Sequence, residues 1–175
     1  MNSIIRFDRY ITFWFQSWPA SLYPYMIVIT QLGNVGWVIG VSLVIAITAY
    51  KKRQVQLALA FSTVLPGEGL NAILKTLFKR LRPQTQFAQD MLIHTKSFPS
   101  GHAFGSMLLY GLLAYLAFTR LSHGWNWFAC STLMLLIVLI GISRIYLGAH
   151  YFFDVLSGWI LGAVILIVVI KVTRI

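Results

Sequence analysis

Long runs without a charged residue alternate along the chain with short polar segments. With histidine taken as neutral, the uncharged runs cover residues 10–50, 54–67, 97–119, 121–143 and 155–170. One helix needs about 20 apolar residues to cross the roughly 30 Å hydrocarbon layer of a bilayer. The pattern therefore predicts an all-α fold, a polytopic transmembrane helical bundle of about five spans.

Turn-forming and helix-breaking residues divide these runs into individual spans. We expect spans at residues 25–50, 55–78, 101–118, 125–143 and 151–170. The dipeptide Pro66-Gly67 lies inside the second span and predicts a kink there. Residues 81–100 are polar and contain two prolines, which favours a loop between the second and third spans.

The N-terminal segment, residues 4–18, differs from the spans because charged residues crowd its start. Its apolar residues recur at helical spacing: Ile4, Phe7, Ile11, Trp14 and Trp18. A short helix with one apolar face and a charged face is typical of the membrane surface. This segment therefore favours an interfacial amphipathic helix over a span.

Composition agrees with a membrane protein and excludes an ordinary soluble domain. Hydrophobic residues make up 58% of the chain and charged residues 10%, whereas soluble domains carry about 25% charged residues. The net charge of +10 comes from bases that flank apolar helices, so anionic lipid explains it better than nucleic acid does. We expect one domain, residues 1–175, with no nucleic-acid partner and no obligatory protein partner.

The order of the spans assigns their ends to two faces of the bilayer. The end of the second span, the start of the third, the end of the fourth and the start of the fifth share one face. The opposite face receives six bases and no acid: Lys51, Lys52, Arg53, Arg120, Lys171 and Arg174. Basic segments favour the cytoplasmic side, so we expect the shared face to be extracytoplasmic.

Two polar segments of the shared face carry bases and a helix start. Lys75 and Arg82 are seven residues apart, which places them on one helical face, although bases at a helix end also snorkel to the lipid boundary. The second segment opens the third span, where Ser100 is a natural cap and Gly101 lets an anion approach free amide groups. His102, just inside, could deliver a proton, and an ordinary helix start is the alternative.

The third polar segment of the shared face joins the fourth and fifth spans. It contains Arg144, His150 and Asp154. If the helix begins by His150, the carboxylate of Asp154 lies one turn away and can engage one imidazole nitrogen, leaving the other as a nucleophile. A purely structural His-Asp pair is the alternative.

Together these segments supply three fixed cations, backbone donors, two histidines and a carboxylate. Phosphoryl transfer needs positive charge on the phosphate oxygens, an in-line nucleophile and an acid for the leaving oxygen. The acids are few and scattered: Asp8, Glu68, Asp90 and Asp154. We therefore expect no metal and no cofactor, because the cations would neutralise the phosphate.

Three motifs, in this order, resemble the complete signature of the type 2 phosphatidic acid phosphatase (PAP2) superfamily: Lys75-x6-Arg82-Pro83, Pro99-Ser100-Gly101-His102 and Ser143-Arg144-x5-His150-x3-Asp154. The resemblance implies that His150 attacks phosphorus and becomes phosphohistidine, that Asp154 orients it and that His102 protonates the leaving group. It also implies a set of phosphate-binding residues: Lys75, Arg82, Ser100, Gly101 and Arg144. Membrane members of this superfamily commonly have six spans, so the short N-terminal helix is a departure.

The resemblance implies an integral membrane phosphatase acting on a phosphomonoester or pyrophosphate of a lipid. Similar bacterial enzymes act on phosphatidylglycerol phosphate, undecaprenyl pyrophosphate or lipid A 1-phosphate. We accordingly expect the bacterial cytoplasmic (inner) membrane as the location, with the active site on the periplasmic face. A lipid-to-lipid phosphotransferase would use the same residues, and a non-enzymatic transporter or scaffold is the remaining alternative.

Glu68 is an acid in the middle of a predicted span. It lies seven residues before Lys75, and Asn71 continues the same helical face. An ionised carboxylate inside a membrane is costly unless it is paired or wet. Glu68 and Asn71 therefore either bridge helices around the predicted kink or line a substrate cavity.

Overall fold

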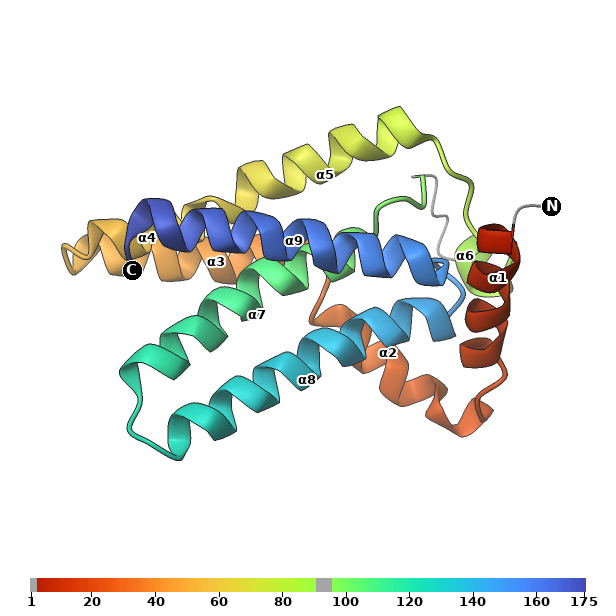
Figure 1. The fold of residues 1–175 in the computed structure, drawn as a ribbon, viewed down its shortest axis with the longest axis horizontal. Helices are drawn as coiled ribbons and strands as arrows, with labels where there is room; N and C mark the ends of the chain where they lie inside the picture. The colour runs from red at the N-terminus through yellow and green to blue at the C-terminus, as the bar shows by residue number, and fades with distance from the viewer. Residues whose placement is uncertain (1–2, 91–95) are drawn as a thin grey trace.

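Long apolar helices run through most of the molecule, as the uncharged runs predict (Figure 1). The computed structural model describes residues 3–90 and 96–175. The described helices are α1 Ser3–Gln16, η1 Ala20–Leu22, α2 Tyr23–Gln31, α3 Val35–Lys51, α4 Val55–Ser62, α5 Val64–Phe78, α6 Gln86–Asp90, α7 Gly101–Arg120, α8 Trp125–Tyr146 and α9 Phe152–Thr173.

The number of membrane spans agrees with the prediction. Within the described ranges, four segments are long and apolar enough to cross a bilayer alone: Val55–Phe78, Gly101–Arg120, Trp125–Tyr146 and Phe152–Thr173. The pair Ala20–Gln31 and Val35–Lys51 passes the same test as one broken span, which makes a fifth. The all-α transmembrane fold is therefore confirmed.

The first span is not the continuous helix that we predicted over residues 25–50. The chain bends by 40° between α2 and α3, at residues 32–34. Asn34 starts α3 as an N-cap, because its Oδ1 accepts a hydrogen bond from the Gly36 amide at 2.9 Å. Asparagine is among the best N-cap residues. The bend gives α2 a polar end inside the bundle.

The second span is interrupted close to the predicted kink. Helix α4 ends at Ser62, four residues before Pro66, and α5 begins at Val64. Proline has no N–H, so Pro66 cannot donate to the carbonyl of Ser62 and the helical ladder opens there. The predicted loop at residues 81–100 was wrong in one detail, because it contains the short helix α6.

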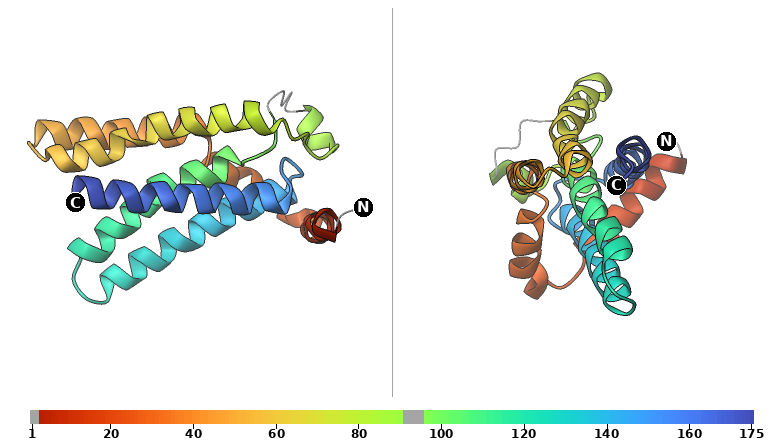
Figure 2. Two further views of the ribbon diagram at one scale, coloured as in Figure 1. Left: turned by 45° about the horizontal axis from the view of Figure 1, so that its top comes forward. Right: turned by 90° about the vertical axis from the view of Figure 1, so that its left-hand side faces the viewer.

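Helix α7 occupies the centre of the bundle, between α8 and α9 (Figures 1 and 2). Its residues Phe104, Leu108 and Leu112 are buried in the main hydrophobic core. The start of α7 touches α9 at Gly158, where a Cβ atom would lie 2.6 Å from the carbonyl oxygen of Ser100. The absence of a side chain at Gly158 therefore allows the start of α7 to pack closely against the first turns of α9.

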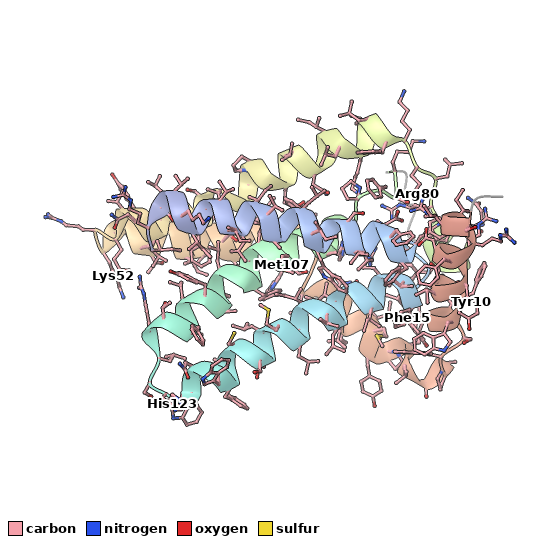
Figure 3. All side chains as sticks on the ribbon, viewed as in Figure 1. Tyr10, Phe15, Lys52, Arg80, Met107 and His123 are labelled. Carbon is pink, nitrogen blue, oxygen red and sulfur yellow. The ribbon has the colours of Figure 1, made fainter. Side chains whose placement is uncertain are left out.

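The two ends of the bundle differ in what they carry. Lys52 and His123 lie at one end and Arg80 at the other (Figure 3). At the Arg80 end, α1 lies across the ends of α8 and α9, and Figure 2 shows it end-on beyond them. The predicted N-terminal helix is thus present. Apolar residues of this helix, such as Ile4 and Phe7, are exposed.

Candidate active site

Most of the predicted site residues surround one cavity of about 480 Å³, whose lining includes Arg82, two residues after Arg80. Eight of the ten line its wall: Glu68, Asn71, Lys75, Arg82, Gly101, His102, Arg144 and His150. The other two, Ser100 and Asp154, are fully buried and joined to each other, since the Ser100 amide donates to the Asp154 carbonyl at 2.9 Å. The helices therefore bring the three polar segments together, as their shared face predicted.

Two of the predicted phosphate-binding cations come from the end of α5 and the segment after it. Lys75 Nζ donates to the carbonyl oxygens of Pro99 at 2.6 Å and Lys96 at 3.1 Å. Lys79 ends α5 in the left-handed conformation, with φ 51°, and the chain then turns back toward the cavity. Burial lowers the pKa of Arg82 to about 10, so Arg82 stays protonated at neutral pH.

The third predicted cation, Arg144, is held by a residue that the sequence did not single out. Its Nη1 donates to Oγ1 of Thr30 at 2.8 Å, and both side chains are buried. Thr30 lies at the end of α2, just before the bend. The polar run Thr30-Gln31 inside an apolar span was the available signal. Arg144 Nε is buried with no hydrogen-bond partner among the described residues, so it can still donate to a ligand.

Helix α7 begins at the cavity as predicted. Ser100 is its N-cap, and its Oγ accepts a long hydrogen bond from the Ala103 amide at 3.5 Å. Gly101 and His102, the first residues of the helix, line the cavity. Free amide groups at a helix N-terminus attract anions. The arrangement can therefore bind a phosphate oxygen close to the His102 ring.

His150 lies in a tight turn rather than in the helix that follows. Helix α9 begins at Phe152, so the condition that the helix begins by His150 is not met. The amide groups of Ala149 and His150 both donate to the carbonyl of Arg144, and Gly148 allows the turn with φ +71°. The turn still brings His150 Nδ1 to 3.6 Å from Asp154 Oδ2.

The other ring nitrogen of His150 faces Arg82. Arg82 Nη1 lies 3.0 Å from His150 Nε2. Because a guanidinium group can only donate, Nε2 must be the acceptor and Nδ1 carries the proton of the neutral ring. Burial, and then the positive charges of Arg82 and Arg144, lower the pKa of His150 well below its ordinary value. Nε2 is therefore the ring nitrogen that carries a lone pair, on a side chain that lines the cavity.

Asp154 is held from three directions. Its Oδ2 accepts hydrogen bonds from Ser97 Oγ at 2.7 Å and from the Tyr151 amide at 2.9 Å. Its Oδ1 accepts from Arg80 Nη1 at 2.6 Å. No local pattern in the sequence indicates Ser97, and Arg80 is one of the bases at a helix end for which a position at the lipid boundary is the alternative interpretation. Instead, Arg80 turns inward and pairs with the buried carboxylate.

A metal-binding cluster is absent from residues 3–90 and 96–175. No three His, Cys, Asp or Glu side chains in those ranges gather as a metal site would require. The charges that face the cavity are those of Lys75, Arg82 and Arg144, together with Glu68. The cavity therefore suits an anion.

Comparison with known proteins agrees with this geometry. The family model described as the PAP2 superfamily matches residues 55–174, which include all three motifs. The chain belongs to the PAP2 superfamily. The cavity residues of the three motifs lie within the matched range, whereas α2, outside it, adds Ile27 and Thr30 to the cavity wall.

Two curated PAP2 relatives are similar over different lengths. The chain is 36% identical over 104 residues to phosphatidylglycerophosphatase B of Bacillus subtilis (strain 168), covering 57% of this chain and 49% of that protein. It is 27% identical over 151 residues to an undecaprenyl-diphosphatase of Sulfolobus acidocaldarius, covering 82% and 67%. The first alignment thus spans about half the length of its relative.

A solved PAP2 structure matches nearly the whole chain. It is the crystal structure of a transmembrane PAP2 type phosphatidylglycerolphosphate phosphatase from Bacillus subtilis. The TM-score is 0.85 with 27% identity, and the match covers 99% of this chain and 88% of the other. The likeness includes the N-terminal helices that precede the range of the family model.

Proposed function

We propose that this integral membrane protein is a phosphatase that removes phosphate from a lipid phosphomonoester or pyrophosphate. One observation carries the proposal: three cations and two histidines line a single cavity. The three cations suit the equatorial oxygens of a transferring phosphoryl group. The neutral Nε2 of His150 suits the role of nucleophile.

In the first step, the lone pair of His150 Nε2 attacks phosphorus and an N–P bond forms. The bond between phosphorus and the leaving oxygen breaks, and His102 gives that oxygen its proton. In the second step, water attacks the phosphohistidine, with His102 accepting a proton from the water. The N–P bond breaks, inorganic phosphate leaves and both histidines return to their initial states.

Asp154 supports the charge that develops on His150 in the first step. As Nε2 bonds to phosphorus, the imidazole ring becomes positive, and its Nδ1 lies 3.6 Å from Oδ2 of the Asp154 carboxylate. A carboxylate in this position keeps the tautomer and favours the cationic ring, as in other His-Asp pairs. Lys75, Arg82, Arg144, Ser100 and Gly101 are the proposed phosphate-binding residues.

A lipid substrate fits the place of the cavity within the helices. Apolar residues of two candidate spans, Ile27 of α2 and Ala72 of α5, line it beside the charged groups. A headgroup can therefore reach the cations while its tails stay among the helices and lipid. Phosphatidylglycerol phosphate and undecaprenyl pyrophosphate are the first candidates, after the names of the relatives, and lipid A 1-phosphate is the third. We place the protein in the bacterial cytoplasmic membrane, with the cavity at the periplasmic face.

The test is purified protein against these three lipids, with inorganic phosphate and lipid products both followed. We expect turnover by the wild type, and rapid-quench samples should contain acid-labile, base-stable phosphate on the protein. His150→Ala should abolish both signals, because covalent catalysis has no substitute for its nucleophile. His123→Ala, at the opposite end of the bundle, is the matched control.

Three results would overturn parts of this proposal. More than a few per cent of wild-type turnover in His150→Ala contradicts the nucleophile. Phosphate that appears on a second lipid, and not in water, indicates a phosphotransferase. No turnover of any lipid phosphate by folded wild-type protein contradicts the phosphatase itself.

A further inference from the structure

Arg80 joins two carboxylates that are far apart in the sequence. Its Nη2 pairs with Oδ2 of Asp8 in α1, and its Nη1 donates to Oδ1 of Asp154 in α9 at 2.6 Å. The solvent-exposed fraction of the side chain is 2% for Asp8 and 0% for Asp154. Two buried carboxylates need a shared cation or they pay a large desolvation cost. Asp8, Arg80 and Asp154 are therefore one electrostatic unit.

Helix α1 also satisfies the free amide groups at the start of α9. Asp8 Oδ1 accepts from the Phe153 amide at 2.8 Å, and Thr12 Oγ1 accepts from the Phe152 amide at 3.1 Å. The first amides of a helix have no partner within the helix, and a capping side chain normally comes from the residue just before it. Here the caps come from more than 100 residues away, so α1 fixes the end of α9 that carries Asp154.

Two polar residues of α1 face the protein, and several of its large apolar residues face outward. Asp8 and Thr12, one turn apart, are buried, whereas Ile4, Phe7 and Trp14 are exposed. An exposed apolar face suits a helix at the lipid boundary. The hydrophobic effect would draw that face toward lipid, so the polar contacts specify where α1 docks.

The position of Arg80 is fixed from a third side as well. Its guanidinium carbon lies 4.5 Å from the centre of the Tyr151 ring, over the ring face. Tyr151 is also the residue whose amide donates to Asp154. Arg80 belongs to the non-helical segment between α5 and α6, so no helix fixes its backbone. The contacts with Asp8, Tyr151 and Asp154 therefore determine where its charge sits.

We infer that Asp8 and Arg80 are positioning residues of the catalytic centre: Asp8 anchors Arg80, and Arg80 holds the Asp154 carboxylate against His150. The inference rests on the proposed function, in which Asp154 supports the developing charge on His150. It assigns α1 a role in catalysis that its amphipathic sequence alone does not indicate. Neither residue touches the substrate cavity, so both should act on turnover more than on substrate binding.

A second cavity makes a specific rescue experiment practical. It measures about 650 Å³ and is lined by Asp8, Arg80 and Tyr151 among others. In Arg80→Ala, a guanidinium ion from solution can enter there and replace the missing group between the two carboxylates. Urea has nearly the same shape without the charge and is the matched small-molecule control.

The experiment compares wild type with Asp8→Asn, Arg80→Ala, the double variant and Arg6→Ala on one lipid substrate. Arg6 is exposed on the same helix, so Arg6→Ala should behave as wild type. We expect Asp8→Asn and Arg80→Ala to lower kcat by about 10- to 100-fold, as small misplacements of catalytic groups do, with little change in KM. The double variant should be no worse than Arg80→Ala, because Asp8 acts through Arg80.

Guanidinium at millimolar concentration should raise the kcat of Arg80→Ala several-fold, and urea should not. The rescue should be weaker when Asp8→Asn is also present. Thermal unfolding in detergent is measured on every variant, so that loss of fold is separated from loss of turnover. Variants as active as wild type, or an unrescued Arg80→Ala that is folded, would overturn the inference. Inactive wild type and Arg6→Ala would instead contradict the proposed function.

Discussion

Arg82 donates a hydrogen bond from Nη1 to Nε2 of His150 across 3.0 Å. This nitrogen is the one proposed to attack phosphorus. In the absence of a bound anion, the lone pair of Nε2 therefore accepts a hydrogen bond from Arg82. A phosphate oxygen is a stronger acceptor than a neutral imidazole. Substrate binding should therefore draw Arg82 toward phosphate and free the nucleophile at the same moment.

The first prediction concerns the pH dependence of turnover. Burial and the charges of Arg82 and Arg144 lower the pKa of His150, so the ring stays neutral and nucleophilic as pH falls through 6.5. In Arg82→Gln one cation is lost, protonation of His150 becomes less costly and its pKa rises. The acidic limb of kcat/KM should then move to higher pH.

This limb is measured in wild type, Arg82→Gln and Lys79→Gln with the same lipid, so that the ionisation of the substrate cancels. Lys79 is exposed outside the cavity, and its variant should keep the wild-type limb. Arg82→Gln should also lose about 100-fold in kcat, the usual effect of removing one donor to a transition-state oxygen. A limb that stays in place or moves to lower pH in Arg82→Gln would contradict the account of His150.

The second prediction is that activity survives extensive dialysis against EDTA and that vanadate inhibits it competitively. Lys75, Arg82 and Arg144 supply the positive charge that a metal ion would otherwise provide. Vanadate adopts a five-coordinate form that resembles the transition state. Initial rates with and without EDTA, Mg²⁺ and vanadate test this. An absolute requirement for Mg²⁺ at the catalytic step would refute the prediction.

The third prediction concerns orientation in the membrane. The six bases on the Lys52 end favour the cytoplasm, which places the cavity end outside. In a Cys130→Ala background, Gln84→Cys should react with a membrane-impermeant thiol reagent in intact cells, and Gln54→Cys should not. Both native residues are exposed, so both should react after permeabilisation. The reverse labelling pattern would invert the topology.

Much of the site could be predicted from the sequence because charged residues stand out in apolar runs. Lys75, Arg144 and His150 interrupt or border such runs, and helical spacing placed them on one face of the bilayer. What spacing could not supply is the turn before α9. There, Gly148 takes φ +71°, and His150 reaches Asp154 without being in the same helix.

The remaining differences come from tertiary contacts that leave no local pattern. Thr30, just before the bend between α2 and α3, accepts its hydrogen bond from Arg144, 114 residues away. Asp8 meets Arg80 across 72 residues. In the sequence, Asp8 is only one of several charges at the start of an amphipathic helix. The helical spacing of apolar residues predicts this helix correctly, but it does not indicate which face of the helix packs against the protein.

The last prediction concerns Glu68, whose Oε1 is buried and accepts no hydrogen bond within the described residues. Oδ1 of Asn71 is likewise buried and accepts no hydrogen bond within the described residues. Both side chains line the cavity. Glu68 packs against Gly105 of α7, which is not among the residues that line the cavity. Side chains that line a ligand cavity and carry an acceptor without a protein donor suit donors on the ligand. Glu68 should therefore bind a hydroxyl group of the lipid headgroup.

Glu68→Gln keeps the shape of the side chain, removes its charge and turns one acceptor into a donor. Phosphatidylglycerol phosphate carries a free hydroxyl, whereas the undecaprenyl pyrophosphate chain has none, so the variant should shift the ratio of their kcat/KM values toward undecaprenyl pyrophosphate. A lost hydrogen bond to a charged acceptor is worth about 1.5–3 kcal/mol, which corresponds to roughly tenfold or more in that ratio. Thr76→Ala, on the exposed side of the same helix, should leave the ratio unchanged. A purely helix-bridging Glu68 predicts a lower unfolding temperature with an unchanged ratio, and that result would remove Glu68 from the substrate-binding site.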